Sequence, residues 1–156
     1  MKAYVGLGGN LGDVENNFKT ALALLNSLPE VCLLEVSSFY RNPAISPIPQ
    51  PDFLNGVCCF EWSKDPFSLF KALQQIQRIL GQKPKPKEAP RLIDLDLLFF
   101  GKEEIQTLEL EVPHPRWQER LFVLIPLAEL TATIEVGGVI FDILEMREKL
   151  YAQSPC

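Results

Sequence analysis

The sequence has little cysteine and no long apolar run. It contains four cysteines, namely Cys32, Cys58, Cys59 and Cys156. Neither a C-x-x-C metal motif nor a disulfide framework is present, so we expect reduced cysteines. The longest apolar run, 121–130, is broken by Pro126 and Glu129 and is too short to span a membrane. The first residues lack the apolar core of a secretory signal, so we expect a cytoplasmic protein with no membrane contact.

The chain also lacks an excess of positive charge. It has 15 Lys and Arg against 20 Asp and Glu, a formal net charge of −5. Bulk nucleic-acid binding needs a basic surface, so we expect no nucleic-acid partner. Basic residues gather locally in 83–91 and 116–120, which suits a small anionic ligand. The length of 156 residues and the 47% hydrophobic content predict a single globular domain over 1–156.

Apolar patterning predicts strands and helices in the order strand-helix-strand-strand-helix-strand. The expected strands cover 4–8, 33–41, 53–62 and 92–100, and the helices begin after the caps Asp13 and Asp65. Further on we expect one or two short strands within 105–112, a short helix from Pro126, a hairpin over 134–141 and a helix over 142–151. This order predicts a ferredoxin-like α+β sandwich with a mostly antiparallel sheet and appended strands and helices.

The sharpest chemical signal is the pair Asp94 and Asp96 on the fourth expected strand. Residues two apart on a strand share a face, which places the two carboxylates roughly 7 Å apart. Such a pair can hold one or two hard cations, and without a cation the carboxylates repel and their pKa values rise. The alternative is an ordinary half-buried strand with a hydrated outer face, which shows the same alternation.

The rest of this strand favours a pocket over an open surface. Strict alternation places Leu98 and Phe100 on the aspartate face, so an acidic face becomes apolar along the strand. The opposite face would then consist of Ile93, Leu95, Leu97 and Phe99.

Basic side chains surround the aspartates in sequence. Arg91 precedes them, and His114, Arg116 and Arg120 follow. A metal site with arginine and histidine is suited to phosphoryl transfer, in which the protein positions phosphates and neutralises developing charge. A single histidine between two prolines can equally be structural.

Two further segments allow either a functional or a structural interpretation. The glycines of 6–13 do not form a dinucleotide fingerprint, because Leu11 occupies the third glycine position, and no complete phosphate loop is present. They suit a tight turn close to a ligand or to a neighbouring strand. Phe53 and Asn55 share a strand face, where a ring and a carboxamide could stack on a planar heterocycle and read its edge, or simply pack in the fold.

These segments, in this order, resemble the 6-hydroxymethyl-7,8-dihydropterin pyrophosphokinase family of folate biosynthesis. The segments that carry the resemblance are 8–12, 37–41, 50–55, 90–96, 112–116 and 120–124. The resemblance implies that ATP gives its β,γ-pyrophosphoryl group to the pterin hydroxymethyl group, with two Mg²⁺ ions as cofactors at Asp94 and Asp96. Its substrates would be ATP and the pterin, and we expect a monomer.

The resemblance also implies site residues. The catalytic group would be Arg91, Asp94, Asp96, His114 and Arg120. The pterin would contact Gly8, Asn42, Pro43, Ala44, Ile45, Phe53, Asn55 and Phe122. ATP would contact Gln74, Arg91, Leu97, His114, Arg116 and Arg120.

The sequence departs from the family pattern in three places. The loop 82–90 carries lysines and prolines where arginines and a tryptophan are usual, with Glu88 near the tryptophan position, so Lys83, Lys85 and Lys87 are candidate substitutes. Gln77 stands where glutamate is common, and Phe53 where tyrosine is frequent. The altered loop supports a second hypothesis, a catalytically weakened ligand-binding domain on the same fold. A third, a nicotinamide-dependent enzyme, lacks its glycine fingerprint.

Overall fold

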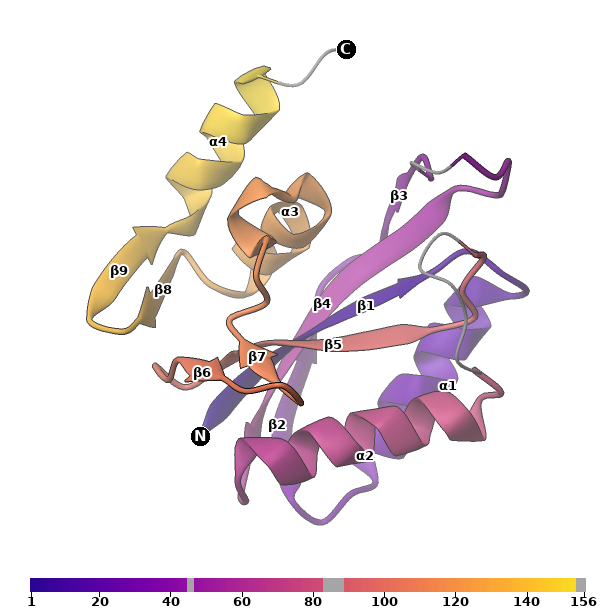
Figure 1. The fold of residues 1–156 in the computed structure, drawn as a ribbon, viewed down its shortest axis with the longest axis horizontal. Coiled ribbons are helices and arrows are strands. Elements are labelled where there is room, and N and C mark those ends of the chain that lie inside the picture. The colour runs from indigo at the N-terminus through magenta and orange to yellow at the C-terminus, as the bar shows by residue number, and fades with distance from the viewer. Residues whose placement is uncertain (45–46, 83–88, 154–156) are drawn as a thin grey trace.

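The computed structural model describes residues 1–44, 47–82 and 89–153. Its centre is a five-stranded antiparallel sheet in the order β2-β4-β1-β5, with β3 paired to β4 (Figure 1). These strands are β1 (Lys2–Gly9), β2 (Val31–Val36), β3 (Tyr40–Asn42), β4 (Phe53–Trp62) and β5 (Asp94–Phe100). The fold is therefore of the mixed α+β class that the sequence predicts.

Two helices, α1 (Val14–Asn26) and α2 (Pro66–Ile79), cover one face of the sheet (Figure 1). Both begin at the predicted caps. Asp13 accepts a hydrogen bond from the backbone N–H of Asn16, and Asp65 accepts from those of Phe67 and Ser68. These bonds satisfy amide groups that have no partner within the helix.

The opposite face carries α3 (Leu121–Leu130) and smaller elements (Figure 1). These are β6 (Ile105–Gln106), β7 (Glu111–Val112), the 3₁₀ turn η1 (Trp117–Glu119), the hairpin β8 (Thr133–Val136) and β9 (Val139–Asp142), and α4 (Ile143–Gln153). The hairpin and the last helix confirm the prediction. No helix in the described part of the chain is long and apolar enough to cross a membrane.

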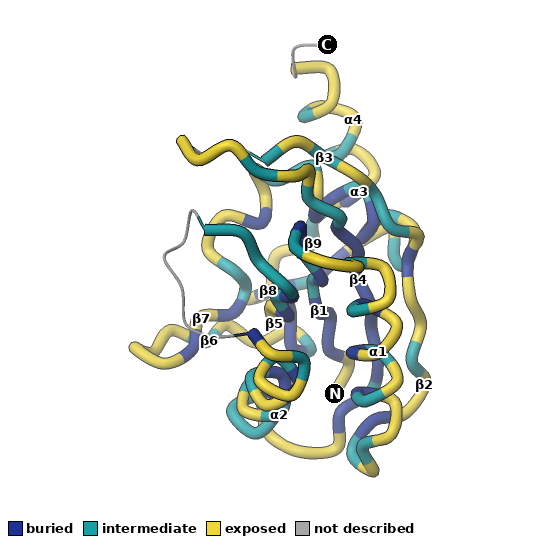
Figure 2. The backbone as a smooth tube through the Cα atoms, turned by 90° about the vertical axis from the view of Figure 1, so that its right-hand side faces the viewer, coloured by how far each residue is buried: buried dark blue, intermediate teal, exposed yellow. Residues whose placement is uncertain are grey.

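The sheet separates two apolar cores. One core joins the sheet to α1 and α2 through side chains such as Leu7, Phe18 and Leu73, and the other joins it to α3 and η1. Figure 2 shows the central strands β1, β4 and β5 as mainly buried, whereas most of β2 and much of the helices α1 and α2 are exposed. Cys58 lies in the first core and Cys59 in the second, as strand alternation predicts, and both are free thiols.

Helix α3 begins five residues earlier than expected, at Leu121, and contains Pro126 in its interior. The prediction of a start at Pro126 is wrong because it used only the preference of proline for a first helical turn. Burial of Val123, Leu124 and Leu127 against the sheet stabilises the whole segment as a helix. This start places Phe122 in the first turn of α3, beside the sheet.

The expected strand 33–41 is two strands, β2 and β3, separated by 37–39. Ser37 explains the break, because its hydroxyl accepts the backbone N–H of Val57 at 2.9 Å, while its own N–H reaches the Val57 carbonyl. The ring of Phe39 covers Gly56, where a Cβ atom would lie 2.8 Å from the ring. The Ser37 hydroxyl thus takes the place of a backbone acceptor on the neighbouring strand. The alternation of residues along 33–41 does not reveal this substitution.

Strand β5 starts at Asp94 and contains a bulge that corrects the predicted faces. Val5 pairs with Leu97, but Tyr4 pairs with Phe99, so Leu98 is an extra residue in the ladder. Phe99 therefore packs in the α3 core beside Leu98, whereas Phe100 packs in the core of α1 and α2. The prediction was wrong for Phe99 and Phe100 and correct for the residues before the bulge.

Candidate active site

Several predicted site residues, among them Gly8, Asn55, Asp94 and Asp96, lie on the α3 side of the sheet. Leu97 instead packs in the core of α1 and α2, and Gln74 belongs to α2. Gly8 of β1 pairs with Asn55 on one side and with Asp94 on the other. Paired residues share a face, so Asn55, Gly8 and Asp94 form a row across three strands. Gly6 pairs with Asp96 in the next row. Neither glycine places a side chain between the amide and the carboxylates, and the nearest atoms over Gly8 and Gly6 belong to the side chains of Asn55 and Leu98.

Two amides lie at one end of this row. Asn42 of β3 donates a hydrogen bond from Nδ2 to Oδ1 of Asn55, which is largely buried. The Nδ2 atom of Asn55 faces Gly8, where a Cβ atom would lie 3.1 Å away. Asn42 pairs with the half-buried Phe53, and Pro43 and Ala44 follow it in the chain. The predicted pterin residue Ile45 lies outside the described residues.

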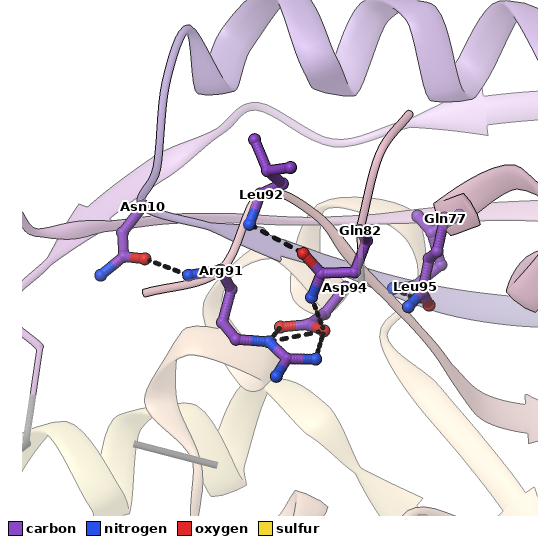
Figure 3. A network of polar contacts seen from close by, with 7 residues as sticks. All are labelled: Asn10, Gln77, Gln82, Arg91, Leu92, Asp94 and Leu95. Atoms are coloured by element: carbon purple, nitrogen blue, oxygen red, sulfur yellow. Dashed lines mark hydrogen bonds and ion pairs between the residues drawn. The ribbon is translucent and has the colours of Figure 1, made fainter. Parts of the chain in front are cut away.

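At the other end of the row, Asp94 is engaged by two neighbours (Figure 3). The Nη2 atom of Arg91 lies 2.9 Å from Oδ1 of Asp94, and its Nε atom lies 3.2 Å from both carboxylate oxygens. Gln82 adds a longer contact of 3.4 Å from Nε2 to Oδ1. Arg91, predicted to hold phosphates, is the counterion of Asp94 in this structure.

Asp96 lines a pocket that is open to solvent. Asp96 is exposed, and the protein around the pocket still desolvates its carboxylate. Desolvation and the neighbouring charge of Asp94 raise the pKa of Asp96 to about 6, although the nearby cations Arg120 and Arg91 oppose the shift. A bound cation would favour the ionised carboxylate and so oppose the rise in the pKa of Asp96.

The pocket beside Asp96 has a volume of about 370 Å³. Leu97 and His114, both predicted to contact ATP, line it. Phe70 of α2 also lines it, whereas Gln74, one turn later on the same helix, is not among its described lining residues. The backbone N–H of His114 donates to the carbonyl of Leu98 at 3.3 Å, which ties this segment to β5.

The remaining predicted residues lie at the start of α3 and just before it. The guanidinium carbon of Arg120 lies 5.4 Å from the ring centre of Phe122, a cation–π contact. Phe122 is 36% exposed, so its ring is available to a ligand. Arg116 is also exposed, and its Nε atom lies 2.9 Å from a carboxylate oxygen of Glu119.

Three amide side chains hold the start of β5 (Figure 3). Sequence reasoning missed this role for Asn10 and Gln82 and assigned none to Gln77. Asn10, 3% exposed, accepts the N–H of Arg91 at 2.8 Å. Gln82 accepts the N–H of Leu92 at 3.0 Å, and Gln77 accepts that of Leu95 at 2.9 Å. An amide oxygen accepts as a carboxylate oxygen would, which accounts for Gln77 where the family commonly has glutamate. No periodicity identifies such residues, because their partners lie far away in sequence.

Comparisons with known proteins identify the family of the chain. The model of the 7,8-dihydro-6-hydroxymethylpterin-pyrophosphokinase family matches residues 4–132. The 2-amino-4-hydroxy-6-hydroxymethyldihydropteridine pyrophosphokinase of Bacillus subtilis (strain 168) is 43% identical over 133 residues, which are 85% of this chain and 80% of that protein. The Pseudomonas aeruginosa protein of the same name is 37% identical over 136 residues, covering 87% and 84% of the two chains.

Solved structures show the same fold. The HPPK-DHPS protein of Plasmodium falciparum, solved with pteroate, superposes with a TM-score of 0.73 at 12% identity. The match covers 97% of this chain and 43% of that longer chain. Together, the family model and the relatives show that the chain belongs to the 7,8-dihydro-6-hydroxymethylpterin-pyrophosphokinase family.

Proposed function

We propose that Asp94 and Asp96 hold the Mg²⁺ ions of an ATP-dependent pterin pyrophosphokinase. The reaction of the family is the function of this chain: it transfers pyrophosphate from ATP to 6-hydroxymethyl-7,8-dihydropterin in folate biosynthesis, giving AMP and the pterin diphosphate. The observation that carries the residue assignment is the row of Asn55, Gly8 and Asp94, with Asp96 beside it. It combines an amide that can read a heterocycle with carboxylates that can bind cations.

The donor set fits magnesium. Among the described residues, no cluster of three or more His, Cys, Asp or Glu side chains could form a complete metal cage. Mg²⁺ is commonly held by one or two carboxylates, and its other ligands are water and substrate phosphates. Bound at Asp94 and Asp96, two such ions would neutralise charge on the triphosphate during transfer.

The chain's own residues bind and orient the substrates in this proposal. Asn55, held by Asn42, reads the edge of the pterin, and the ring stacks between Phe53 and the exposed Phe122. Gly8, Pro43 and Ala44 supply backbone around it, and the fourth residue that the family resemblance implies, Ile45, lies outside the described residues.

ATP lies beside Asp96 in the proposed arrangement. Leu97, which lines the pocket, borders the adenine together with Gln74. The cations Arg91, Arg116 and Arg120, with His114, hold the phosphates, and Arg91 turns from Asp94 towards them when ligands bind. Charge-assisted donors of this kind stabilise the charge that develops during phosphoryl transfer.

The function is tested by measuring AMP release from ATP with 6-hydroxymethyl-7,8-dihydropterin and Mg²⁺. We expect AMP and the pterin diphosphate in equal amounts, and no AMP when the pterin is omitted. Tight pterin binding without turnover would instead support the weakened binding domain suggested by the loop 82–90. Residues 83–88 of that loop, including the candidate substitutes Lys83, Lys85 and Lys87 and also Glu88, lie outside the described part of the chain.

Mg²⁺ affinity should fall as the pH is lowered through 6. With the pKa of Asp96 at about 6, about a quarter of these carboxyls are ionised at pH 5.5, so binding should weaken about fourfold relative to pH 7.5. Isothermal titration with Mg²⁺ and a non-hydrolysable ATP analogue at the two pH values measures the change. In the control Asp96→Asn, the Mg²⁺ affinity should be the same at the two pH values. A fourfold weakening at pH 5.5 in this variant too would assign the pH dependence to another group.

The raised pKa of Asp96 also makes the stability of the folded protein depend on pH. In the metal-free protein a protonated Asp96 avoids the desolvation cost, so this group favours the folded state most below its ordinary pKa of 3.8. That advantage disappears as the pH rises through about 6. Saturating Mg²⁺ and nucleotide should therefore raise the melting temperature more at pH 7.5 than at pH 5.5.

Finer aspects of the architecture are also proposals. The strand order β2-β4-β1-β5, with two helices on one face, supports a ferredoxin-like sandwich. A single pyrophosphokinase domain over 1–156, a monomeric state and a cytoplasmic location stay predictions.

A further inference from the structure

One carboxylate of α3 holds the short edge strand β3. Glu129, in the last turn of the helix, accepts hydrogen bonds at Oε1 from the backbone N–H and the hydroxyl of Ser38, both at 3.0 Å. Its Oε2 atom accepts the hydroxyl of Tyr40. The partners are about 90 residues away in sequence, so the contact is purely tertiary.

The position of Glu129 is unfavourable for the helix itself. The C-terminal end of a helix carries a partial negative charge, which disfavours a carboxylate there. Desolvation would raise the pKa of Glu129, but hydrogen bonds from Tyr40 and Ser38 outweigh it and lower the pKa. The hydrogen bonds from Ser38, just before β3, and from Tyr40, within β3, therefore explain why Glu129 is charged at the end of the helix.

Strand β3 is a short strand with a single pairing partner among the described strands. It has only three residues, and within the described sheet it pairs with β4 alone. Tyr40 pairs with Asn55, and Asn42 pairs with Phe53, so the anchored tyrosine lies directly opposite the amide of the pterin site. The side chain of Asn42 completes the link by donating to Asn55.

The same helix begins at the opposite wall of the site. Phe122 lies in the first turn of α3, and Glu129 lies two turns further along. One rigid element therefore carries the exposed ring at one end and the carboxylate that holds β3 at the other. The Glu129 bonds connect the wall formed by α3 to the wall formed by β3 and β4.

We propose that Glu129 is a positioning residue for pterin binding, which fixes β3 against α3 and thereby sets the orientation of the Asn42–Asn55 amide pair. The proposal rests on the proposed function, because it assigns the amide pair to the pterin. It requires no contact between Glu129 and substrate. Since Glu129 and Ser38 are exposed, their bonds contribute little to global stability, and their effect is on local geometry.

Steady-state kinetics of Glu129→Ala separate positioning from a general structural role. We expect the KM for the pterin to rise about tenfold, because the Asn42–Asn55 pair is no longer held in its binding orientation, while the KM for ATP and kcat change less than about twofold. Glu129→Gln should raise the KM for the pterin less than Glu129→Ala does, because the amide oxygen still accepts hydrogen bonds from Ser38. Tyr40→Phe, which removes one bond, should raise the KM for the pterin about threefold.

Glu145→Ala is the matched control, since it removes an exposed glutamate of α4 whose carboxylate pairs with Lys149 of the same helix. It should leave both KM values unchanged. Melting temperatures of all variants show whether the chain is folded. An unchanged pterin KM in folded Glu129→Ala, or equal changes in both KM values, would overturn the proposal. Absence of AMP release by the wild-type chain would overturn the proposed function instead.

Discussion

Replacing Asp94 or Asp96 by alanine is expected to abolish turnover, with a loss in kcat of at least about a thousandfold. The two carboxylates lie on one open face of the sheet, and each would hold cation charge against the triphosphate. Asp94 is half-buried and Asp96 is exposed, so neither variant leaves a large cavity in a core. We therefore expect both variants to fold, with circular dichroism spectra like that of the wild type.

Isosteric and distant substitutions separate metal binding from other effects. Asp96→Asn preserves the size of the side chain but removes its charge, so it should be as inactive as Asp96→Ala. Glu103→Ala removes one negative charge at an exposed turn away from the site and should retain wild-type kcat. Wild-type activity in both aspartate variants, measured by AMP release at saturating Mg²⁺, would disprove the metal assignment.

Gly9→Ala is expected to lower kcat/KM about a hundredfold, although Gly9 contacts no substrate in the proposed site. A Cβ atom at Gly9 would lie 2.8 Å from the carbonyl oxygen of Leu92 and 3.4 Å from that of Arg91. Both are backbone atoms just before Asp94, so the start of β5 must shift. Such overpacking costs about 1–3 kcal/mol of stability and moves a carboxylate that needs sub-ångström placement.

Gly6→Ala provides the comparison for folding. Its Cβ atom would meet only the side chain of Leu98, at 3.5 Å, which is ordinary contact. In urea unfolding, Gly6→Ala should therefore lose much less stability than Gly9→Ala. If Gly9→Ala matched the wild type in both stability and activity, the approach of β1 to the start of β5 would have no role in positioning Asp94.

Local sequence patterns were enough to predict the main helices and strands and to single out Asp94 and Asp96 as candidate metal ligands. The caps at Asp13 and Asp65 are local signals, because a carboxylate can satisfy the first amides of its own helix. The shared face of Asp94 and Asp96 could also be predicted, because side chains alternate between the faces of a strand up to a bulge. The ordered motifs identified the family, which the comparisons then showed.

Tertiary structure alone decided how these parts meet. The bulge at Leu98, the pairing of Arg91 with Asp94 and the bonds from Ser38 and Tyr40 to Glu129 join residues through strand register or across the fold. Similarly, α3 begins at Leu121 because its apolar side chains are buried against the sheet, in spite of the local preference at Pro126. Residue periodicity describes one segment at a time, whereas register, ion pairs and burial depend on which segments become neighbours when the chain folds.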